Sequence, residues 1–222
     1  MGLNGNPFRV ADESELAKLY VARFTTGDIS APEIARSSDP VTQIIAPRGW
    51  GKSTLLFAIR KEFETLGMRC HYVYCPPKNR VLWQVPDVVT RAVLIDEAQR
   101  LGQHTKRCVR RWREQTGGRI VAATHEDLSE DLGPSIHTVH LPAADAELIA
   151  QMFRARVQWA GGGMDQFRLT LDAACWLADR AAGSLRWTEE LCYELFQRLE
   201  RHQEVTIDAA LLQRIDHSLK GR

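Results

Sequence analysis

The sequence predicts an α/β fold, built on a parallel β-sheet and followed by a mainly helical C-terminal part. Short β-rich runs alternate with helical stretches up to about residue 142, and one of these runs opens directly into a glycine-rich turn and a helix. From Ala143 onward the strand pattern disappears and helical spacing dominates. Alternating strands and helices are typical of a parallel sheet that is covered by helices on both faces.

Length and composition favour one full domain with a smaller one attached. The chain has 222 residues, of which 44% are apolar, and this is enough for a hydrophobic core. We expect an N-terminal helix and linker over 1–40, a core over 41–142 and a helical segment over 143–222. The 29 Lys and Arg residues balance 28 Asp and Glu residues, so the net charge of +1 excludes a polycation. Any nucleic-acid affinity must come from a local patch.

Cysteine spacing and hydropathy indicate in which cellular compartment the protein works. The five cysteines form no C-x-x-C pair and have no neighbouring histidine ladder, so we expect neither a disulfide framework nor a zinc site. Met1–Val10 lacks a charged start followed by an apolar stretch, and no run approaches the roughly 18 apolar residues of a membrane span. The sequence therefore predicts a cytoplasmic protein without a membrane partner.

The expected elements follow from periodicity and from Gly and Pro breaks. Helical spacing over 11–24 is followed by a loop to Pro40. Strands are expected at Val41–Ile45, Cys70–Tyr74, Ala92–Ile95, Arg119–Ala123 and Thr138–Leu141. A further helix is expected from the end of the glycine-rich turn to about Leu66, and another carries the apolar stripe from Leu148 to Trp159. Three more are expected over Leu171–Ala181, Trp187–Glu200 and Asp208–Leu219.

The glycine-rich turn fits the phosphate-loop pattern G-x-x-x-x-G-K-[ST] from Gly51 onward, but Ala46 stands at its first glycine. Such a loop turns backbone N–H groups at a helix N-terminus toward phosphate oxygens. We expect Lys52 to reach the β- and γ-phosphate oxygens and Ser53 to offer its hydroxyl to Mg²⁺. The expected phosphate-binding residues are Ala46, Pro47, Arg48, Gly49, Trp50, Gly51, Lys52, Ser53 and Thr54. Ala46 fits the loop if its φ is negative, and the alternative is a turn that binds no ligand.

Two adjacent acids follow the apolar strand Val93–Ile95. If the backbone bends at the end of this strand, Asp96 can hold the Mg²⁺ shell while Glu97 reaches the attacking water as a base. An acidic pair at a helix N-terminus is the alternative. The phosphate loop upstream favours the first interpretation, because ligands of parallel sheets gather at the C-terminal ends of the strands.

These motifs resemble those of the AAA+ ATPases, specifically the compact bacterial kind similar to origin-recognition, secretion-ATPase-like and transposition ATP-binding proteins. The stretches that carry the resemblance are Asn6–Phe8, Ile44–Leu55, Val93–Gln99, Ile120–Leu128 and Gly183–Arg186. The resemblance implies a P-loop NTPase sheet with strand order 5-1-4-3-2, an all-helical lid over 143–222, ATP and Mg²⁺ as ligands, and a homo-oligomer.

The resemblance also implies two sensors of the phosphates. Thr124, with His125 as the alternate, would lie over the γ-phosphate, and Arg186 at the start of a helix would contact the β- and γ-phosphates. A polar residue that opens a loop and a solvent-facing arginine are the respective alternatives.

One departure from that family concerns the arginine finger of ring-forming members, which usually lies between the first sensor and the last core strand. No Arg or Lys occurs between Arg119 and Arg154. Either Arg91, Arg110 or Arg113 serves instead, or the protein is a slow nucleotide switch resembling the signal-transduction ATPases.

A basic helix is predicted between Arg100 and Arg119, because this stretch contains seven basic residues and only one acidic residue, Glu114. Its expected inward stripe consists of Thr105, Val109, Trp112 and Thr116. Its expected open side consists of Lys106, Arg107, Arg110, Arg111 and Arg113. Such a face can neutralise the phosphates of DNA or RNA, and the alternatives are a solvated face or a docking surface for an acidic partner.

The sequence thus predicts an ATP-binding, Mg²⁺-dependent ATPase that acts as a switch or assembly factor, with DNA or a protein as candidate partner. A slow, nucleotide-gated interaction module without DNA binding is the second hypothesis. A degenerate loop that binds no nucleotide is the third, and the intact Lys52, Ser53, Asp96 and Glu97 speak against it.

Overall fold

The computed structural model describes residues 3, 5–12, 15, 19, 30–77, 86–87, 89–133, 135–163, 166–199 and 204–220. The chain packs as two compact units. The sheet unit comprises Thr25–Arg48 and Lys52–Leu141, and the helical unit comprises Met1–Phe24, Gly49–Gly51 and Pro142–Arg222. Each unit has its own hydrophobic core.

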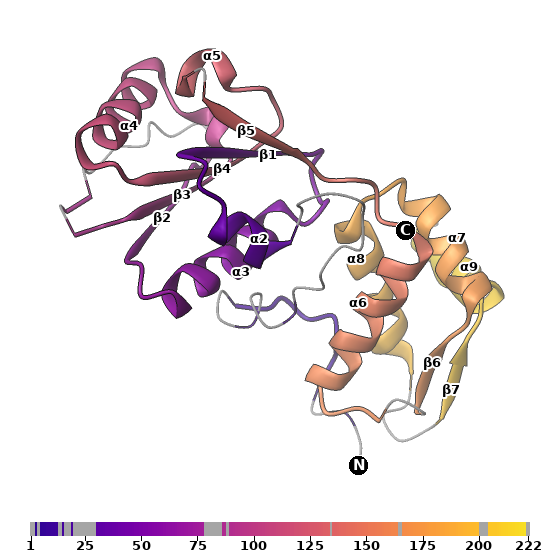
Figure 1. Cartoon of the computed structure of the whole chain (residues 1–222). Helices are drawn as coiled ribbons and strands as arrows, with labels where there is room; N and C mark the ends of the chain where they lie inside the picture. Colours follow the sequence, from indigo (N-terminus) through magenta and orange to yellow (C-terminus); the bar gives the residue numbers. More distant parts are fainter. Residues whose placement is uncertain are drawn as a thin grey trace. The chain divides into compact units, whose positions relative to one another are not determined.

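The sheet unit contains a five-stranded parallel sheet (Figure 1). Its strands are β1 (Val41–Ile45), β2 (Cys70–Tyr74), β3 (Ala92–Asp96), β4 (Arg119–Thr124) and β5 (Ile136–His140). Their order is β2-β3-β4-β1-β5, which confirms the predicted order 5-1-4-3-2. All five residues of β3 are buried, as expected for a strand covered on both faces.

Helices cover both faces of this sheet (Figure 1). One face carries α2 (Ala31–Arg36) and α3 (Lys52–Thr65), and the other carries α4 (Gln103–Thr116) and α5 (Ser129–Leu132). A short 3₁₀ helix, η1 (Ala98–Arg100), follows β3. On the α4 side, Val109, Trp112 and Leu132 form a core with residues of β3 and β4.

The helix α2 was not expected, because the sequence predicts a loop up to Pro40. A capping box explains it: the Ser30 side chain accepts from the Glu33 N–H, and the Glu33 carboxylate accepts from the Ser30 N–H. Pro32 lies in the first turn, where its missing N–H costs nothing. The Ser-x-x-Glu spacing was the available signal. The helix predicted over 11–24 lies mostly outside the described residues.

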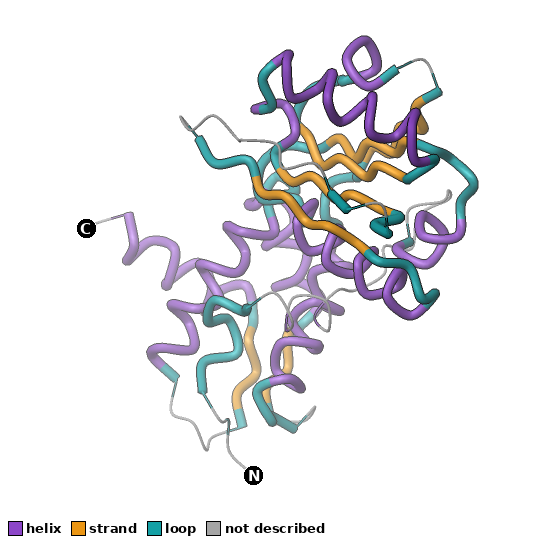
Figure 2. Tube along the Cα trace, turned by 90° about the vertical axis from the view of Figure 1, so that its left-hand side faces the viewer, coloured by secondary structure: helices purple, strands orange, loops and turns teal. Residues whose placement is uncertain are grey.

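The helical unit contains α6 (Ala146–Trp159), α7 (Leu171–Ala181), α8 (Leu185–Arg198) and α9 (Ala209–Lys220). Figure 2 shows that two short strands accompany these helices, and they pair in parallel as β6 (Phe167–Leu169) and β7 (Val205–Ile207). The sequence predicts the helices but not these strands, because three residues are too short for an alternating pattern.

The N-terminal segment belongs to the core of the helical unit. The ring of Phe8 lies 5.6 Å from those of both Phe153 and Phe196. The Asn6 side-chain amide donates to the Tyr193 carbonyl at 2.9 Å. The stretch Asn6–Phe8 therefore anchors the start of the chain to α6 and α8.

Within the described ranges, no helix combines the length and apolar character needed to cross a membrane.

Candidate functional site

The phosphate loop connects β1, which ends at Ile45, to α3, which begins at Lys52. Gly49 and Gly51 have φ values of 79° and 87°, in the region where glycine is favoured. Glu97 and Ala182 are the described non-glycine residues with positive φ, so Ala46 meets the condition that its place in the loop requires. The loop therefore has the backbone geometry that the sequence pattern predicts, despite the missing first glycine.

Lys52 points its side chain back into this loop and is 5% exposed. Its ammonium donates to the carbonyls of Ala46 at 2.7 Å and Pro47 at 2.9 Å. It also lies 3.2 Å from Nδ1 of His125, which follows β4. A buried cation with several acceptors around it is stabilised, and it is placed where the phosphate-loop pattern requires a positive charge.

Asp96 is buried at the C-terminal end of β3, and its carboxylate is fixed from two sides. The Tyr72 hydroxyl donates to Oδ2 at 3.2 Å, and the Glu97 backbone N–H donates to Oδ1 at 3.0 Å. The Tyr72 ring packs on that of Phe57, with 4.8 Å between the ring centroids. Tyr72 on β2, which packs on Phe57 of α3, thus helps to hold the Asp96 carboxylate in place at the C-terminal end of β3.

Glu97 marks the bend that the sequence analysis expects after β3, since its φ is 58°. Its Oε2 accepts from Gln99 at 2.9 Å and pairs with Arg100 at 2.8 Å, and its Oε1 lies 3.3 Å from Nε2 of His125. Burial raises the pKa of Glu97, but the Gln99 hydrogen bond and the charges of His125 and Arg100 outweigh burial and place it below its usual value. Glu97 is therefore a carboxylate at neutral pH.

Thr124 and His125 differ in what their side chains touch. The Thr124 hydroxyl donates to the Glu126 carbonyl at 2.8 Å and accepts from the Glu126 N–H at 3.0 Å, so it closes the turn after β4. His125, the alternate in the sequence analysis, contacts both Lys52 and Glu97. The imidazole, and not the hydroxyl, lies between the phosphate-loop ammonium and the acid.

The residues that the sequence predicts as Mg²⁺ ligands offer oxygen donors. Ser53 lies in the first turn of α3, and Asp96 ends β3. No group of three or more His, Cys, Asp or Glu that could hold a metal ion occurs in the parts of the chain that the structure describes. This donor set fits Mg²⁺, which proteins usually bind through one or two oxygens together with substrate phosphates.

The likeness of this chain to known proteins lies in its fold. No family model matches the chain, and no curated protein sequence matches it. Among solved structures, the RuvB Holliday junction branch migration motor of Thermotoga maritima matches with a TM-score of 0.61 and 20% identity over 85% of this chain and 64% of that one. Domain III of the replication initiation protein DnaA of Thermotoga maritima matches with a TM-score of 0.61 and 15% identity over 98% of both chains.

The chain has the fold of the AAA+ ATPases. At these identities the likeness establishes the fold, and the chain spans less than two thirds of RuvB. The strand order and the helical C-terminal part are those of AAA+ proteins, which confirms the resemblance predicted from the sequence.

The basic helix of this AAA+ fold, α4, requires one correction. Lys106 was expected on the open side, but it is 8% exposed and forms an ion pair with Asp131 of α5. Arg113 is half-buried. The exposed arginines of α4 are Arg107, Arg110 and Arg111, which we call the arginine ridge.

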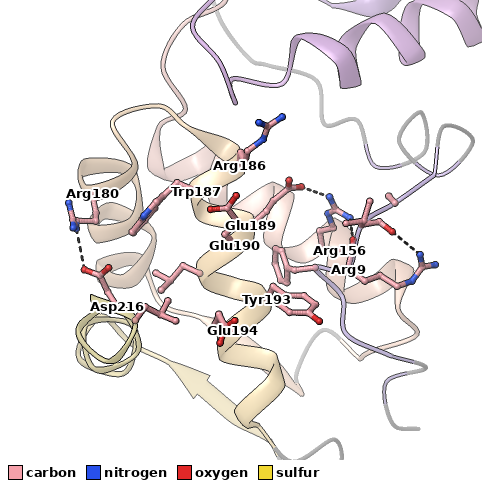
Figure 3. Close-up of a pocket in the computed structure, with 15 residues that line it drawn as sticks. Arg9, Arg156, Arg180, Arg186, Trp187, Glu189, Glu190, Tyr193, Glu194 and Asp216 are labelled. Carbon is pink, nitrogen blue, oxygen red and sulfur yellow. Dashed lines mark hydrogen bonds and ion pairs between the residues drawn. The ribbon is translucent and has the colours of Figure 1, made fainter. Parts of the chain in front are cut away.

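Arg186, the expected second sensor, lies in the first turn of α8. Its backbone N–H donates at 3.2 Å to the carbonyl of Gly49, a residue of the same unit. Figure 3 shows its side chain beside a pocket of about 990 Å³ in the helical unit, pointing away from the charged pairs of that pocket. One pair joins Arg156 to Glu189, and the other joins Arg180 to Asp216 at 3.2 Å.

Sequence reasoning missed Tyr72, Gln99 and Arg100, which contact the two acids. For Arg100, the spacing of three residues from Glu97 was a usable signal, because such residues are neighbours on a helical turn. For Tyr72 there was none, because its contact with Asp96 depends on the pairing of β2 with β3.

Proposed function

We propose that this chain is an Mg²⁺-dependent ATPase whose nucleotide state switches its assembly or its binding to a partner. One observation carries the proposal: Lys52 and Glu97, which lie far apart in the sequence, contact the same imidazole at 3.2 and 3.3 Å. The cation expected to bind phosphate and the carboxylate expected to act as base therefore lie at one site. Asp96 adjoins Glu97, so the acid expected to hold Mg²⁺ lies at this site too.

Each residue has a definite role in this proposal. Lys52 and the backbone N–H groups of the loop bind the β- and γ-phosphates. Ser53 and Asp96 hold Mg²⁺, which neutralises charge on the phosphates. Glu97 is ionised, so it can accept a proton from the attacking water. Arg186 would act as the second sensor, and Thr124 or its alternate His125 as the first, as the resemblance implies.

The variant Glu97→Gln tests the base role, because glutamine keeps the shape but cannot take a proton. ATP turnover should fall by about 10²-fold or more while ATP binding is retained. Glu130→Gln is the matched control, since Glu130 is an exposed acid on α5. Equal turnover in Glu97→Gln and the parent would move the base role elsewhere, with Asp96 as the next candidate.

Homo-oligomer formation belongs to the same proposal. The arginine finger would come from Arg91, Arg110 or Arg113. Each Arg→Ala variant is mixed with Lys52→Ala, and activity should return only if the two lesions lie on opposite sides of one subunit interface. Chromatography with light scattering, with ADP and then with a non-hydrolysable ATP analogue, measures the assembly. A monomer with both nucleotides would support the slow-switch alternative.

DNA is the candidate partner that a specific observation favours. Arg107 and Arg111 are exposed, and neither has an ion-pair partner among the described side chains. Two of the similar structures are named as a Holliday junction motor and a replication initiation protein. We therefore propose that the arginine ridge contacts nucleic-acid phosphates.

Charge reversal of the ridge tests this contact. Changing Arg107, Arg110 and Arg111 to Glu should abolish DNA binding and leave ATP affinity unchanged, because the nucleotide site lies at the strand ends. The logarithm of the parent's DNA-binding constant should fall linearly with the logarithm of the salt concentration. The slope should be about 0.9 for each phosphate contacted. Loss of ATP hydrolysis with intact DNA binding would instead identify one of these residues as the arginine finger. No effect on either activity would make the ridge a solvated face.

A further inference from the structure

We propose that the pocket along α8 is a docking groove for a basic amphipathic segment of a partner protein. The residues that line this groove all belong to the helical unit. They include neither the phosphate loop nor the two acids after β3, so the docking site goes beyond the proposed function and needs no nucleotide.

The groove follows the exposed side of α8 (Figure 3). The N-terminal segment Phe8–Ala11 borders it on one side, and Arg180 of α7 borders it on the other together with Asp216 and Leu219 of α9. Its volume of about 990 Å³ lies at the upper end of the range of ligand pockets, so it has room for several side chains of a partner.

Most charges along the groove are already neutralised. Three ion pairs account for them: Arg9 with Glu15 at 2.7 Å, Arg156 with Glu189, and Arg180 with Asp216 at 3.2 Å. Figure 3 shows the last two pairs on either side of α8, and Arg186 pointing away from them. Arg156 and Asp216 are buried, so these groups serve each other rather than a ligand.

Two carboxylates remain available along α8. Glu190 is exposed and has no ion-pair partner among the described side chains, and Glu194 lies 3.9 Å from Arg198, a distance at which the attraction is weak. Residues four apart lie on the same face of a helix, so the two acids form a short negative stripe. This stripe repels the phosphates of nucleic acids and anionic lipids, and it attracts Lys or Arg side chains.

Apolar side chains border the same groove. Val10 is 92% exposed, Tyr193 is 37% exposed, and Trp187 is half-buried. A partner that covers these side chains gains the hydrophobic free energy of their burial. An apolar groove edged by acids is complementary to an amphipathic segment that carries apolar and basic side chains on one face.

The chain's own basic helix, α4, lacks this combination. Its arginine ridge is exposed, but its large apolar residues Val109 and Trp112 are buried in the core of the sheet unit. A second copy of the chain therefore offers charge through α4 without an apolar anchor. The occupant that matches the groove is a different protein.

Two synthetic helical peptides of about four turns probe the groove. Both carry leucines at helical spacing, and these are flanked by lysines in one peptide and by glutamates in the other. In calorimetry without nucleotide, the basic peptide should bind the parent and the acidic peptide should not. Val10→Ser should weaken binding of the basic peptide by about 5- to 10-fold, the value of one buried aliphatic side chain. Leu171→Ser is the matched control, since Leu171 is 76% exposed in the same unit but does not line the groove.

The acids are tested by the double variant Glu190→Gln with Glu194→Gln. It should bind the basic peptide about 3- to 10-fold more weakly, and the difference from the parent should shrink as salt is added. Glu147→Gln, the same change at an exposed position on α6, should bind as the parent does.

Three results of these titrations would overturn the docking site. They are no binding of the basic peptide with a Kd below about 1 mM, equal binding of the acidic peptide, and unchanged affinity in the groove variants. Sedimentation of the parent without peptide adds a fourth: a dimer that Val10→Ser dissociates would assign the groove to a second copy. Since no sample contains nucleotide, failure here leaves the proposed ATPase function untouched.

Discussion

The hydroxyl of Tyr72 on β2 lies 3.2 Å from Oδ2 of Asp96 on the neighbouring strand β3. This contact fixes one oxygen of the acid expected to hold Mg²⁺, and the Glu97 N–H fixes the other. A metal-binding carboxylate that is held by its neighbours needs less reordering when the ion arrives. Tyr72 should therefore affect the Mg²⁺-dependent part of nucleotide binding.

We expect Tyr72→Phe to weaken ATP binding in the presence of Mg²⁺ by about 3- to 10-fold, the value of one hydrogen bond. Binding in the presence of EDTA should not change. Tyr74→Phe on the same strand is the matched control, since Tyr74 is 51% exposed. Titration of a fluorescent ATP analogue measures both, and an equal loss with and without Mg²⁺ would assign Tyr72 a purely structural role.

The ion pair of Lys106 with Asp131 should matter for stability, because both side chains are largely buried at the contact of α4 with α5. Lys106→Ala leaves Asp131 without its cation and should lower the free energy of unfolding by about 1–3 kcal/mol, between the values for exposed and buried pairs. Arg107→Ala, one residue away and exposed, should change it by less than about 0.5 kcal/mol. Urea unfolding measures both variants, and equal effects would contradict the burial of Lys106.

Acid should loosen the segment that follows His125. Hydrogen bonds from Ser129 and from the Gln43 amide lower the pKa of Asp127 to about 2. The unfolded chain has an aspartate pKa of about 3.9. Because the folded pKa is the lower one, the contribution of Asp127 is complete above pH 4 and is lost as the pH falls toward 2.

Asp127→Asn removes this contribution. The stability difference between parent and variant should be largest at neutral pH and should shrink between about pH 4 and 2. Thermal unfolding across that range measures it. A difference that does not depend on pH would show that the charge of Asp127 is not what matters.

The sheet and the phosphate loop could be predicted from the sequence because their signals are local. A β-rich run, two glycines and a Lys-Ser pair stand next to one another in the chain, and the backbone of Gly49 and Gly51 adopts the conformation that the pattern implies. The two acids were recognisable for the same reason, since they end an apolar strand.

The tertiary contacts of Lys106 and His125 were not predictable in this way. Lys106 stands next to Arg107 on a helix whose periodicity does not show that a long side chain can reach Asp131 on another helix. His125 was named only as an alternate to Thr124, and its place between Lys52 and Glu97 results from the packing of β4 between β1 and β3. Such positions depend on tertiary structure rather than on local pattern.

The most direct test of the account is ATP binding by Lys52→Ala, measured by calorimetry beside Lys61→Ala, an exposed lysine on the same helix. If Lys52 is the phosphate ligand, its loss should weaken ATP binding by about 10- to 150-fold, the value of a charged hydrogen bond. Lys61→Ala should bind ATP as the parent does. Equal ATP affinity in the parent and both variants would contradict the assignment of this loop as the nucleotide site.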